Sequence, residues 1–470
     1  MRKRVLLLAA TLTTGLLTAL PLTPAAAAPS RLNGDFNGDG YLDIALSAAG
    51  HQVGTAQQAG AVVVLYGSSS GVSAAKRTLI TQNSTGVPGT AEAGDLFGES
   101  LAAGDLDGDG YSDLVVGAPN ETIGDRDTVG SATILWGGSS GLSGGALVPQ
   151  PSTLDEWNNF ATGIAVADFD GDGKNDVTLT GRTETRVYKG PFTRTGTPVS
   201  NLRVGELGTT TNVFAGDLNG DRAAERVYPF LVDGDEGGDI RYFTWNGSKH
   251  VMKDLPNADG LPGSIGDING DGYGDVVLGD PTDPDTNKKT GHKGGQISVW
   301  YGGPYGPDPA QTPTVIHQDT AGAPGAGEAE DMFGSSVSTG DINGDGYADV
   351  AVGAPGEDLG TVREAGAVTV LFGSASGLTT KGAKTWTQDT EGVPGGSETG
   401  DQFGQSVRLI DINKNGKADL VTGAGGENGY GAVTVLRGTA SGLTTDYAKF
   451  IGARDVSVQD FGNFAWAIAQ

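Results

Sequence analysis

The chain of 470 residues contains no cysteine, and this absence excludes several kinds of chemistry. A disulfide framework, thiolate-bound zinc, an iron–sulfur cluster and a cysteine nucleophile are all ruled out. Histidine is also scarce, because only His51, His250, His292 and His317 occur, far apart in the sequence. No HExxH motif is present and no other catalytic constellation is recognised, so we expect a protein that is not an enzyme.

Positively charged side chains are also few. The chain has 30 Lys and Arg against 57 Asp and Glu, which gives a formal net charge of −27. Binding of nucleic acid is not expected, because phosphates would find too few positive side chains to neutralise them. The composition instead favours cations as partners. Glycine is abundant, with 80 residues, and hydrophobic residues make up 37% of the chain, which indicates a folded protein rich in turns.

The N-terminus has the features of a secretory signal peptide. Met1–Arg4 is basic, Val5–Leu22 is mostly apolar, and Ala25–Ala28 supplies small residues for cleavage. A retained membrane anchor is the alternative, but threonines and a glycine interrupt the apolar stretch, which is short of the ~20 apolar residues that a span needs. No second run of this length follows. We therefore expect a signal peptide at 1–28, a mature domain at 29–470, no membrane span, and a secreted, extracellular protein.

A nine-residue pattern, Asp-x-Asp/Asn-Gly-Asp-Gly-x-x-Asp, recurs through the rest of the chain. Its copies begin 49 to 74 residues apart, and a period of this size predicts a repeat architecture. Five copies are full and two, at 217–225 and 411–419, are looser. The seven copies lie at 35–43, 105–113, 168–176, 217–225, 267–275, 341–349 and 411–419.

The segments around these loops also repeat. A Phe-Gly pair lies eight residues before the loop at Phe97, Phe333 and Phe403, and sequences such as LVVGAP and VAVGAP follow the loop. β-Branched runs such as GAVTVLFG come next, bounded by Gly and Ser, and they are typical of strands. Each unit thus supplies about four strands, and no helical stripe of apolar residues appears after the signal peptide. The prediction is an all-β, seven-bladed β-propeller of four-stranded blades.

The two ends of the domain complement each other. The first loop starts too soon after residue 28 for an FG strand to precede it, whereas residues 460–466 form an FG strand with no loop behind it. We expect the C-terminal strand to complete the first blade and close the ring, which leaves no exposed sheet edge. An open solenoid would instead need capping units at both ends.

The loops are predicted to bind calcium, which takes six to eight oxygen ligands from carboxylates, amides, carbonyls and water. Positions one, three and five place side-chain oxygens on one side of a tight loop, position seven offers its carbonyl, and position nine closes the site. A single Asp/Gly-rich turn needs no metal, but seven copies in register favour one. An EF-hand or dockerin would need a helix after the loop, and strand sequence follows here. The predicted ligands are Asp35, Asn37, Asp39, Tyr41, Asp43, Asp105, Asp107, Asp109, Tyr111, Asp113, Asp168, Asp170, Asp172, Lys174, Asp176, Asp217, Asn219, Asp221, Glu225, Asp267, Asn269, Asp271, Tyr273, Asp275, Asp341, Asn343, Asp345, Tyr347, Asp349, Asp411, Asn413, Asn415, Lys417 and Asp419.

We expect about five to seven calcium ions with a structural role. Affinity should fall with the number of carboxylates in the loop. The order is then 105–113 and 168–176 first, the loops with one asparagine next, and 411–419 and 217–225 last. Arg222 replaces the second glycine of the loop at 217–225, and we expect it to be unsuited to a positive φ there.

The order Phe-Gly, DxDGDGxxD loop, Gly-Ala-Pro resembles the FG-GAP repeat of the integrin alpha-subunit head. The resemblance is closest around the second, sixth and seventh loops and weakest around the third and fourth. It implies a seven-bladed propeller with calcium loops on one face and ligand contacts mostly on the other. The chain looks like a free-standing secreted member of bacterial type.

On this basis we expect an extracellular binding or adhesion module, a monomer whose ligand is a protein or a polysaccharide. The connections after GAP, including the insert Asp280–Gly295, and the acidic turns before FG are placed on the ligand face. Aromatic residues in Tyr228–Trp245 either stack on sugars or, as we favour, fill the core between blades. The alternative function is an extracellular carbohydrate-active hydrolase or lyase, because propellers also host active sites.

Overall fold

The computed structural model describes residues 32–152, 154–204, 210, 212–231, 238–284, 291–459 and 464–470. The predicted signal peptide lies outside these residues. Within them, no helix is long and apolar enough to cross a membrane.

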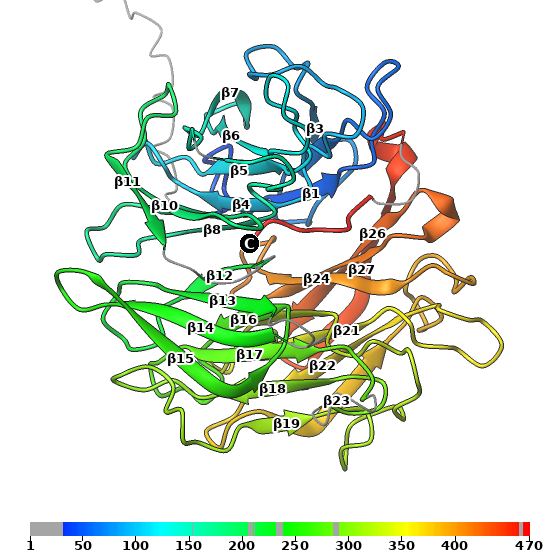
Figure 1. Cartoon of the computed structure of the whole chain (residues 1–470). Helices are drawn as coiled ribbons and strands as arrows, with labels where there is room; N and C mark the ends of the chain where they lie inside the picture. The colour runs from blue at the N-terminus through cyan, green and yellow to red at the C-terminus, as the bar shows by residue number, and fades with distance from the viewer. Residues whose placement is uncertain are drawn as a thin grey trace, which may run out of the picture.

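Seven antiparallel sheets are arranged in a ring, which confirms the all-β, seven-bladed propeller (Figure 1). Six sheets have four strands in sequence order, and the first has three, β1 to β3. Two short 3₁₀ turns, Glu427–Gly429 and Ala453–Val456, lie near the end of the chain. The strands are β1 Ile44–Ala48, β2 Ala61–Leu65, β3 Arg77–Ile80, β4 Leu101–Gly104, β5 Asp113–Ala118, β6 Ser131–Trp136, β7 Ser143–Leu147, β8 Gly163–Ala167, β9 Asp176–Thr180, β10 Thr185–Lys189, β11 Ser200–Val204, β12 Phe214–Gly216, β13 Glu225–Leu231, β14 Gly238–Trp245, β15 His250–Asp259, β16 Gly263–Gly266, β17 Asp275–Asp280, β18 Gln296–Trp300, β19 Thr314–Ile316, β20 Ser336–Gly340, β21 Asp349–Ala354, β22 Ala367–Phe372, β23 Thr379–Trp386, β24 Phe403–Ile410, β25 Asp419–Ala424, β26 Ala432–Thr439 and β27 Gly442–Gly452.

The core lies between neighbouring blades rather than inside any one of them. The second strands β5, β17, β21 and β25 are buried at every position. Their sequences are continuous apolar runs such as DLVVGA because a sheet covered on both faces has no solvent side to make polar. Side chains of adjacent blades mix in each cluster; Val62 of β2, for example, packs in the same cluster as Leu114 and Val116 of β5.

The Phe-Gly pairs anchor each blade to the one before it. Phe97 is fully buried and its N–H donates to the carbonyl of Ala59 in the preceding blade at 3.1 Å, while the N–H of Gly98 donates to Gly117 O in its own blade at 2.9 Å. Gly98 has a φ of +96°, and a Cβ there would lie 2.4 Å from the carbonyl oxygen of Ala61. Only glycine fits this approach of two backbones without strain.

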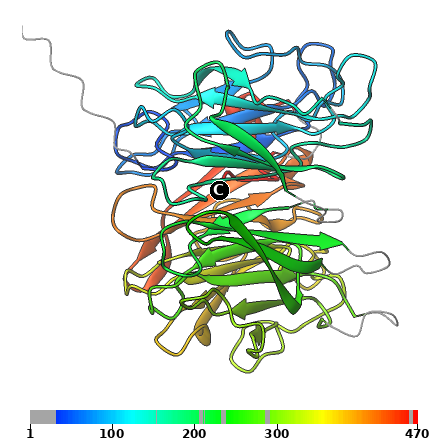
Figure 2. The same cartoon turned by 60° about the vertical axis from the view of Figure 1, so that its left-hand side comes forward.

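The C-terminal segment completes the first blade, as predicted. Ile468 pairs with Leu46 of β1 in an antiparallel bridge, and the Ser47 N–H donates to Ala467 O at 2.9 Å. In Figure 1 the red end of the chain runs beside β1 to the centre of the ring, and Figure 2 shows the same place of the C-terminus from a view turned by 60°. Closure in this way removes the free edge of the first sheet.

The register of this last segment differs from the expectation. Residues 460–463, which include Phe461-Gly462, lie outside the described residues. The Phe-Gly position is taken by Phe464-Ala465: Phe464 is fully buried and the Ala465 N–H donates to Ser47 O at 2.8 Å. Phe160-Ala161 does the same in the third blade, where the Ala161 N–H donates to Thr180 O at 2.8 Å. Ala161 and Ala465 adopt a positive φ in place of glycine.

Replacement of Phe464 by Ala should destabilise the closed ring, because it leaves a cavity between the last blade and the first. A loss of about 3–5 kcal/mol in unfolding free energy is expected for a buried phenylalanine. Denaturant unfolding with calcium present measures it, and Trp466→Ala, at a residue that is 47% exposed, is the control. Equal effects of the two substitutions would show that Phe464 does not anchor the closure.

Candidate functional site

In six blades the nine-residue loop joins the first strand to the second, and in the first blade it leads into β1, so all seven loops lie on one face of the ring. Position nine is the first residue of the second strand in six blades, as with Asp113 in β5 and Asp349 in β21. These position-nine carboxyl groups are buried, and each blade therefore brings a carboxylate into its interior.

The position-nine carboxylate links three segments of its blade. In the second blade, Asp113 Oδ2 accepts from the N–H of Leu106 at 2.9 Å and Oδ1 accepts from the N–H of Gly137 at 2.8 Å. Gly137 follows the third strand, β6, and a Cβ there would lie 2.2 Å from the carbonyl oxygen of Ser112. The same two-sided contact occurs at Asp43, with Phe36 and Gly67 as donors.

The position-one carboxylate organises the loop itself. Asp105 accepts from the N–H groups of Gly108 at 2.8 Å and Gly110 at 3.0 Å. Asp217 accepts in the same way from Gly220 and from Arg222, the latter at 2.8 Å. Arg222, which we expected to suit this position poorly, adopts a φ of +73° and keeps the loop closed. The conformation costs about 1–2 kcal/mol for a residue with a Cβ.

In two loops the acidic side chains converge closely enough to hold a metal ion. Oxygens of Asp105, Asp107 and Asp113 lie within 4.8 Å of one another, and so do those of the equivalent residues at 168, 170 and 176. Burial, with a smaller contribution from Asp107, raises the pKa of Asp113 to about 7. A divalent cation would supply the positive charge that such a cluster lacks, and the donor set of carboxylate and carbonyl oxygens fits calcium.

Each of these two loops is contacted by a basic side chain from outside the loop, which the sequence analysis missed. Arg194 contacts Asp107 and forms an ion pair with Asp109 at 2.5 Å, and Lys189 contacts Asp170 and Asp172, the latter at 2.9 Å. Both basic residues come from the hairpin between β10 and β11. Nothing in the nine-residue pattern signals them, because the hairpin meets the loops only in the folded ring.

In the two looser loops, an asparagine amide donates to the position-nine carboxylate instead. Asn219 Nδ2 donates to Glu225 Oε1 at 2.7 Å, and Asn413 Nδ2 donates to both oxygens of Asp419 at 2.7 and 2.9 Å. An N–H₂ group aimed at the position-nine carboxylate occupies the direction from which a cation would bind. This geometry agrees with their place at the end of the predicted affinity order.

Neighbouring loops are hydrogen-bonded to one another around the ring. At five junctions the N–H of position eight donates to the carbonyl of position one in the preceding loop; the pairs are Ser112–Asp35, Ala224–Asp168, Gly274–Asp217, Ala348–Asp267 and Ala418–Asp341, at 2.7–3.1 Å. A change in one loop is therefore transmitted directly to the backbone of the next.

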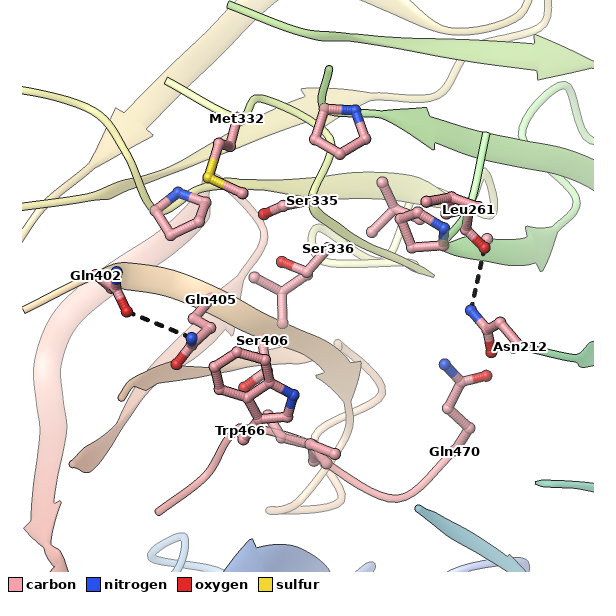
Figure 3. A pocket seen from close by; sticks show the side chains of 18 residues that line it. Asn212, Leu261, Met332, Ser335, Ser336, Gln402, Gln405, Ser406, Trp466 and Gln470 are labelled. Atoms are coloured by element: carbon pink, nitrogen blue, oxygen red, sulfur yellow. Dashed lines mark hydrogen bonds between the residues drawn. The ribbon is translucent and has the colours of Figure 1, made fainter. Parts of the chain in front are cut away.

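The opposite face has a pocket of about 590 Å³ at the axis of the ring. It is lined by the starts of the innermost strands β16, β20 and β24 and by the C-terminal segment. Figure 3 shows Trp466 and Met332 on opposite walls, with the amides of Gln402 and Gln405 between them. Trp466 is 47% exposed and Met332 is 44% exposed. The described lining thus combines an aromatic ring, a thioether and several amides and hydroxyls.

A smaller cavity of about 200 Å³ lies along the axis, between the innermost strands, and contains Arg408. Burial lowers the pKa of the Arg408 guanidinium. Gln470 lines both cavities, so the two lie next to each other.

The acidic turns before the Phe-Gly pairs have a structural role that the sequence analysis did not identify. Asp331 accepts from the N–H of Glu328 in its own turn at 2.7 Å. Beside it, Gln318 donates to Glu357 at 2.5 Å, and Gln82–Glu121 and Gln388–Glu427 repeat this pair. Burial, followed by the charge of Asp331, raises the pKa of Glu357 to about 7. Hydrogen bonds at these turns therefore link each blade to the next.

Part of the aromatic group of the fourth blade belongs to the core, as favoured, whereas Phe230 and Trp245 are half-buried and outside the core clusters. Tyr228 and Tyr242 are buried, and Phe243 contacts Tyr228 edge-on with ring centroids 5.6 Å apart.

Comparison with known proteins agrees with the repeat geometry. The model of the FG-GAP repeat matches residues 32–65, 97–135, 333–371 and 403–436, and the FG-GAP-like repeat matches 168–228. The chain carries FG-GAP repeats in an integrin-alpha-like β-propeller. It is 31% identical to integrin alpha-IIb of Mus musculus over 176 residues and 32% identical to integrin alpha-6 of Homo sapiens over 186 residues.

Other similarities extend beyond integrins. The FG-GAP chain is 30% identical over 145 residues to the phosphatidylinositol-glycan-specific phospholipase D of Rattus norvegicus. These matches cover 31–38% of this chain but only 14–17% of the relatives. A solved lectin from Agrocybe aegerita, described as recognising non-reducing terminal N-acetylglucosamine, is similar with a TM-score of 0.41 and 17% identity over 76% of this chain and 84% of the lectin.

Removal of the basic side chains should strengthen calcium binding at the two most acidic loops. In Arg194→Gln and Lys189→Gln, calcium no longer competes with a tethered cation for the carboxylates. An exposed ion pair contributes about 0.2–1 kcal/mol, so each substitution should tighten one site roughly two- to fivefold. Calorimetric titration with calcium measures this, with Arg203→Gln, whose partner is Glu184, as the control. Weaker binding in the variants would mean that the basic residues support the sites.

The half-buried carboxyl of Glu357 makes stability depend on pH. Its pKa is raised from 4.5 to about 7 in the folded protein. The folded state therefore binds the proton more tightly than the unfolded state, and stability falls as pH rises through this interval. Glu357→Gln should melt about 1–3 °C higher than the parent at about pH 8, with no advantage at about pH 4. Glu391→Gln, at an exposed position, is the control; an equal gain at both pH values would contradict the assignment.

Proposed function

We propose that this FG-GAP protein is a secreted, extracellular binding module whose calcium ions are structural and whose ligand binds at the axial pocket. The observation that carries the proposal is the division of the ring into two faces. Acidic loops linked by backbone hydrogen bonds occupy one face, and an open pocket with an exposed tryptophan occupies the other.

The acidic loops support a structural role for calcium. Their carboxylates stand close together on a chain of net charge −27, so like-charge repulsion opposes the closed ring. Calcium bound to the folded loops would offset that repulsion and stabilise the folded state by mass action. Because five junctions connect one loop to the next, binding at one loop orders its neighbours.

The axial pocket supports an uncharged ligand. Among its described lining residues no side chain is acidic or basic, whereas an aromatic ring and four amides face the cavity. An apolar surface with a few polar groups is typical of small-ligand sites. Pyranose rings present both an apolar face and hydroxyl groups, and we therefore favour a neutral polysaccharide over a protein ligand. The secretory signal predicted at 1–28 would bring the module to such a ligand outside the cell.

The test is retention of the purified protein on a panel of neutral polysaccharides, acidic polysaccharides and matrix proteins. We expect retention on a neutral polysaccharide and at least a tenfold loss of affinity in Trp466→Ala. Trp157→Ala is the matched control, because Trp157 is 58% exposed and does not line the pocket. Retention only on matrix proteins, or equal loss in both variants, would contradict the assignment of a glycan ligand to this pocket.

Calcium dependence is measured on the same protein. The melting temperature should fall when a chelator removes calcium, and added calcium should restore it. Unchanged melting in chelator would contradict a structural role for the ions, whatever the outcome of the ligand panel.

A further inference from the structure

Two of the four histidines of the chain meet on the face opposite the acidic loops. His292 lies in the connection between β17 and β18, and His317 directly follows β19. Their rings are stacked, with centroids 3.5 Å apart and planes inclined by 10°. Asp319 completes the group, since its Oδ2 lies 3.5 Å from His292 Nε2. One ligand atom from each of the three residues lies within 4.8 Å of the others.

We propose that His292, His317 and Asp319 form a binding site for a zinc ion, separate from the calcium loops. Two imidazole nitrogens and one carboxylate oxygen make a ligand set that zinc prefers, with water in the fourth position. Calcium takes oxygen ligands instead, so this site discriminates between the two metals.

The hydrogen bonds around His292 prepare it to bind a metal. Its Nδ1 lies 2.8 Å from the carbonyl oxygen of Lys293, and because a carbonyl only accepts, Nδ1 carries the proton. In the neutral ring Nε2 is then left with its lone pair directed toward Asp319. A backbone carbonyl on the far nitrogen is the usual second partner of a metal-binding histidine.

The other two groups also have a free ligand atom. His317 Nδ1 is buried and has no hydrogen-bond partner among the described residues. Asp319 uses Oδ1 to accept the N–H of Gly327 at 3.1 Å, which orients the carboxylate and leaves Oδ2 toward His292. A lone pair facing a carboxylate at 3.5 Å is repulsive unless a cation or a proton lies between them.

The repeats of the same chain show that the turn does not require the imidazole of His317. Gln82, Gln318 and Gln388 mark three equivalent turns, because each donates to a glutamate of the next blade. The residue before the glutamine is Thr81 in one turn and Thr387 in another, where the backbone N–H makes the same bond to a hydroxyl as that of His317. The imidazole at position 317 is therefore an addition to the turn.

The two rings have to turn out of their stack to bind one zinc ion, because the lone pairs of stacked rings lie in nearly parallel planes. Ligand atoms around a tetrahedral zinc ion at ~2.0–2.1 Å stand about 3.3 Å apart. The side chains of His292 and Asp319 are 26% and 48% exposed, so both can rotate toward an ion and the fourth position is open to water.

The experiment is calorimetric titration of the calcium-saturated protein with zinc, because calcium in excess keeps zinc off the acidic loops. We expect one zinc per chain with micromolar or tighter affinity. His317→Thr copies Thr81 and Thr387, and Asp319→Asn copies Asn83, which accepts the N–H of Ala91 in the equivalent turn. Each substitution should therefore preserve the turn and weaken zinc binding at least tenfold.

His250→Gln is the matched control, since His250 lies at the start of β15 beside Trp245, away from the site. It should leave zinc affinity unchanged, and the melting curves of all variants in calcium should overlay that of the parent. No zinc binding by the parent, or equal affinity in parent and His317→Thr, would overturn the proposal and leave a protonated His292–Asp319 ion pair as the reason for the arrangement.

Discussion

The contact on which the propeller depends is the buried carboxylate at position nine of each loop. In six of the seven loops it accepts an N–H from position two of its loop and another from a residue at the end of the third strand or just after it; Glu225 accepts from the Leu218 N–H and the Asn219 amide instead. One side chain therefore connects the first, second and third strands of a blade. Charge-assisted hydrogen bonds of this kind are about twice as strong as neutral ones.

This arrangement places a negative charge where burial makes it costly. A buried carboxylate needs a proton, a basic partner or a metal ion close by, and different loops meet this need differently. The loops at 105–113 and 168–176 have a basic side chain across their acidic groups, and those at 217–225 and 411–419 have an asparagine amide. The loops at 35–43, 267–275 and 341–349 have glycine at positions four and six and an acidic residue at positions one, five and nine.

The face opposite the loops varies more than the loop face. Connections between the second and third strands differ in length and sequence from blade to blade, while the strands beneath them keep one register. The axial pocket and the His292–His317–Asp319 group both lie on this side. Binding sites on such connections can diverge because a rigid ring holds their ends.

Much of the fold could be predicted from short-range patterns in the sequence. The spacing of the Asp-rich loops, the Phe-Gly pairs eight residues before them and the β-branched runs after them are short-range signals, and they predicted the number of blades and the strand order within each. Even the departure at the C-terminus had a signal, since Asn159-Phe160-Ala161 in the third blade has the same three residues as 463–465. Alanine in place of glycine concealed it.

The sequence by itself determined which residues form strands, where the loops turn and how many blades close the ring, because these depend on neighbours within about ten residues. Only the tertiary structure decided which charges meet. Arg194 is 85 residues from Asp109, and it contacts that loop because the third blade packs beside the second. His292 and His317 meet within one blade, where β18 pairs with β19, whereas Met332 and Trp466 converge on one pocket because the closed ring brings their segments together.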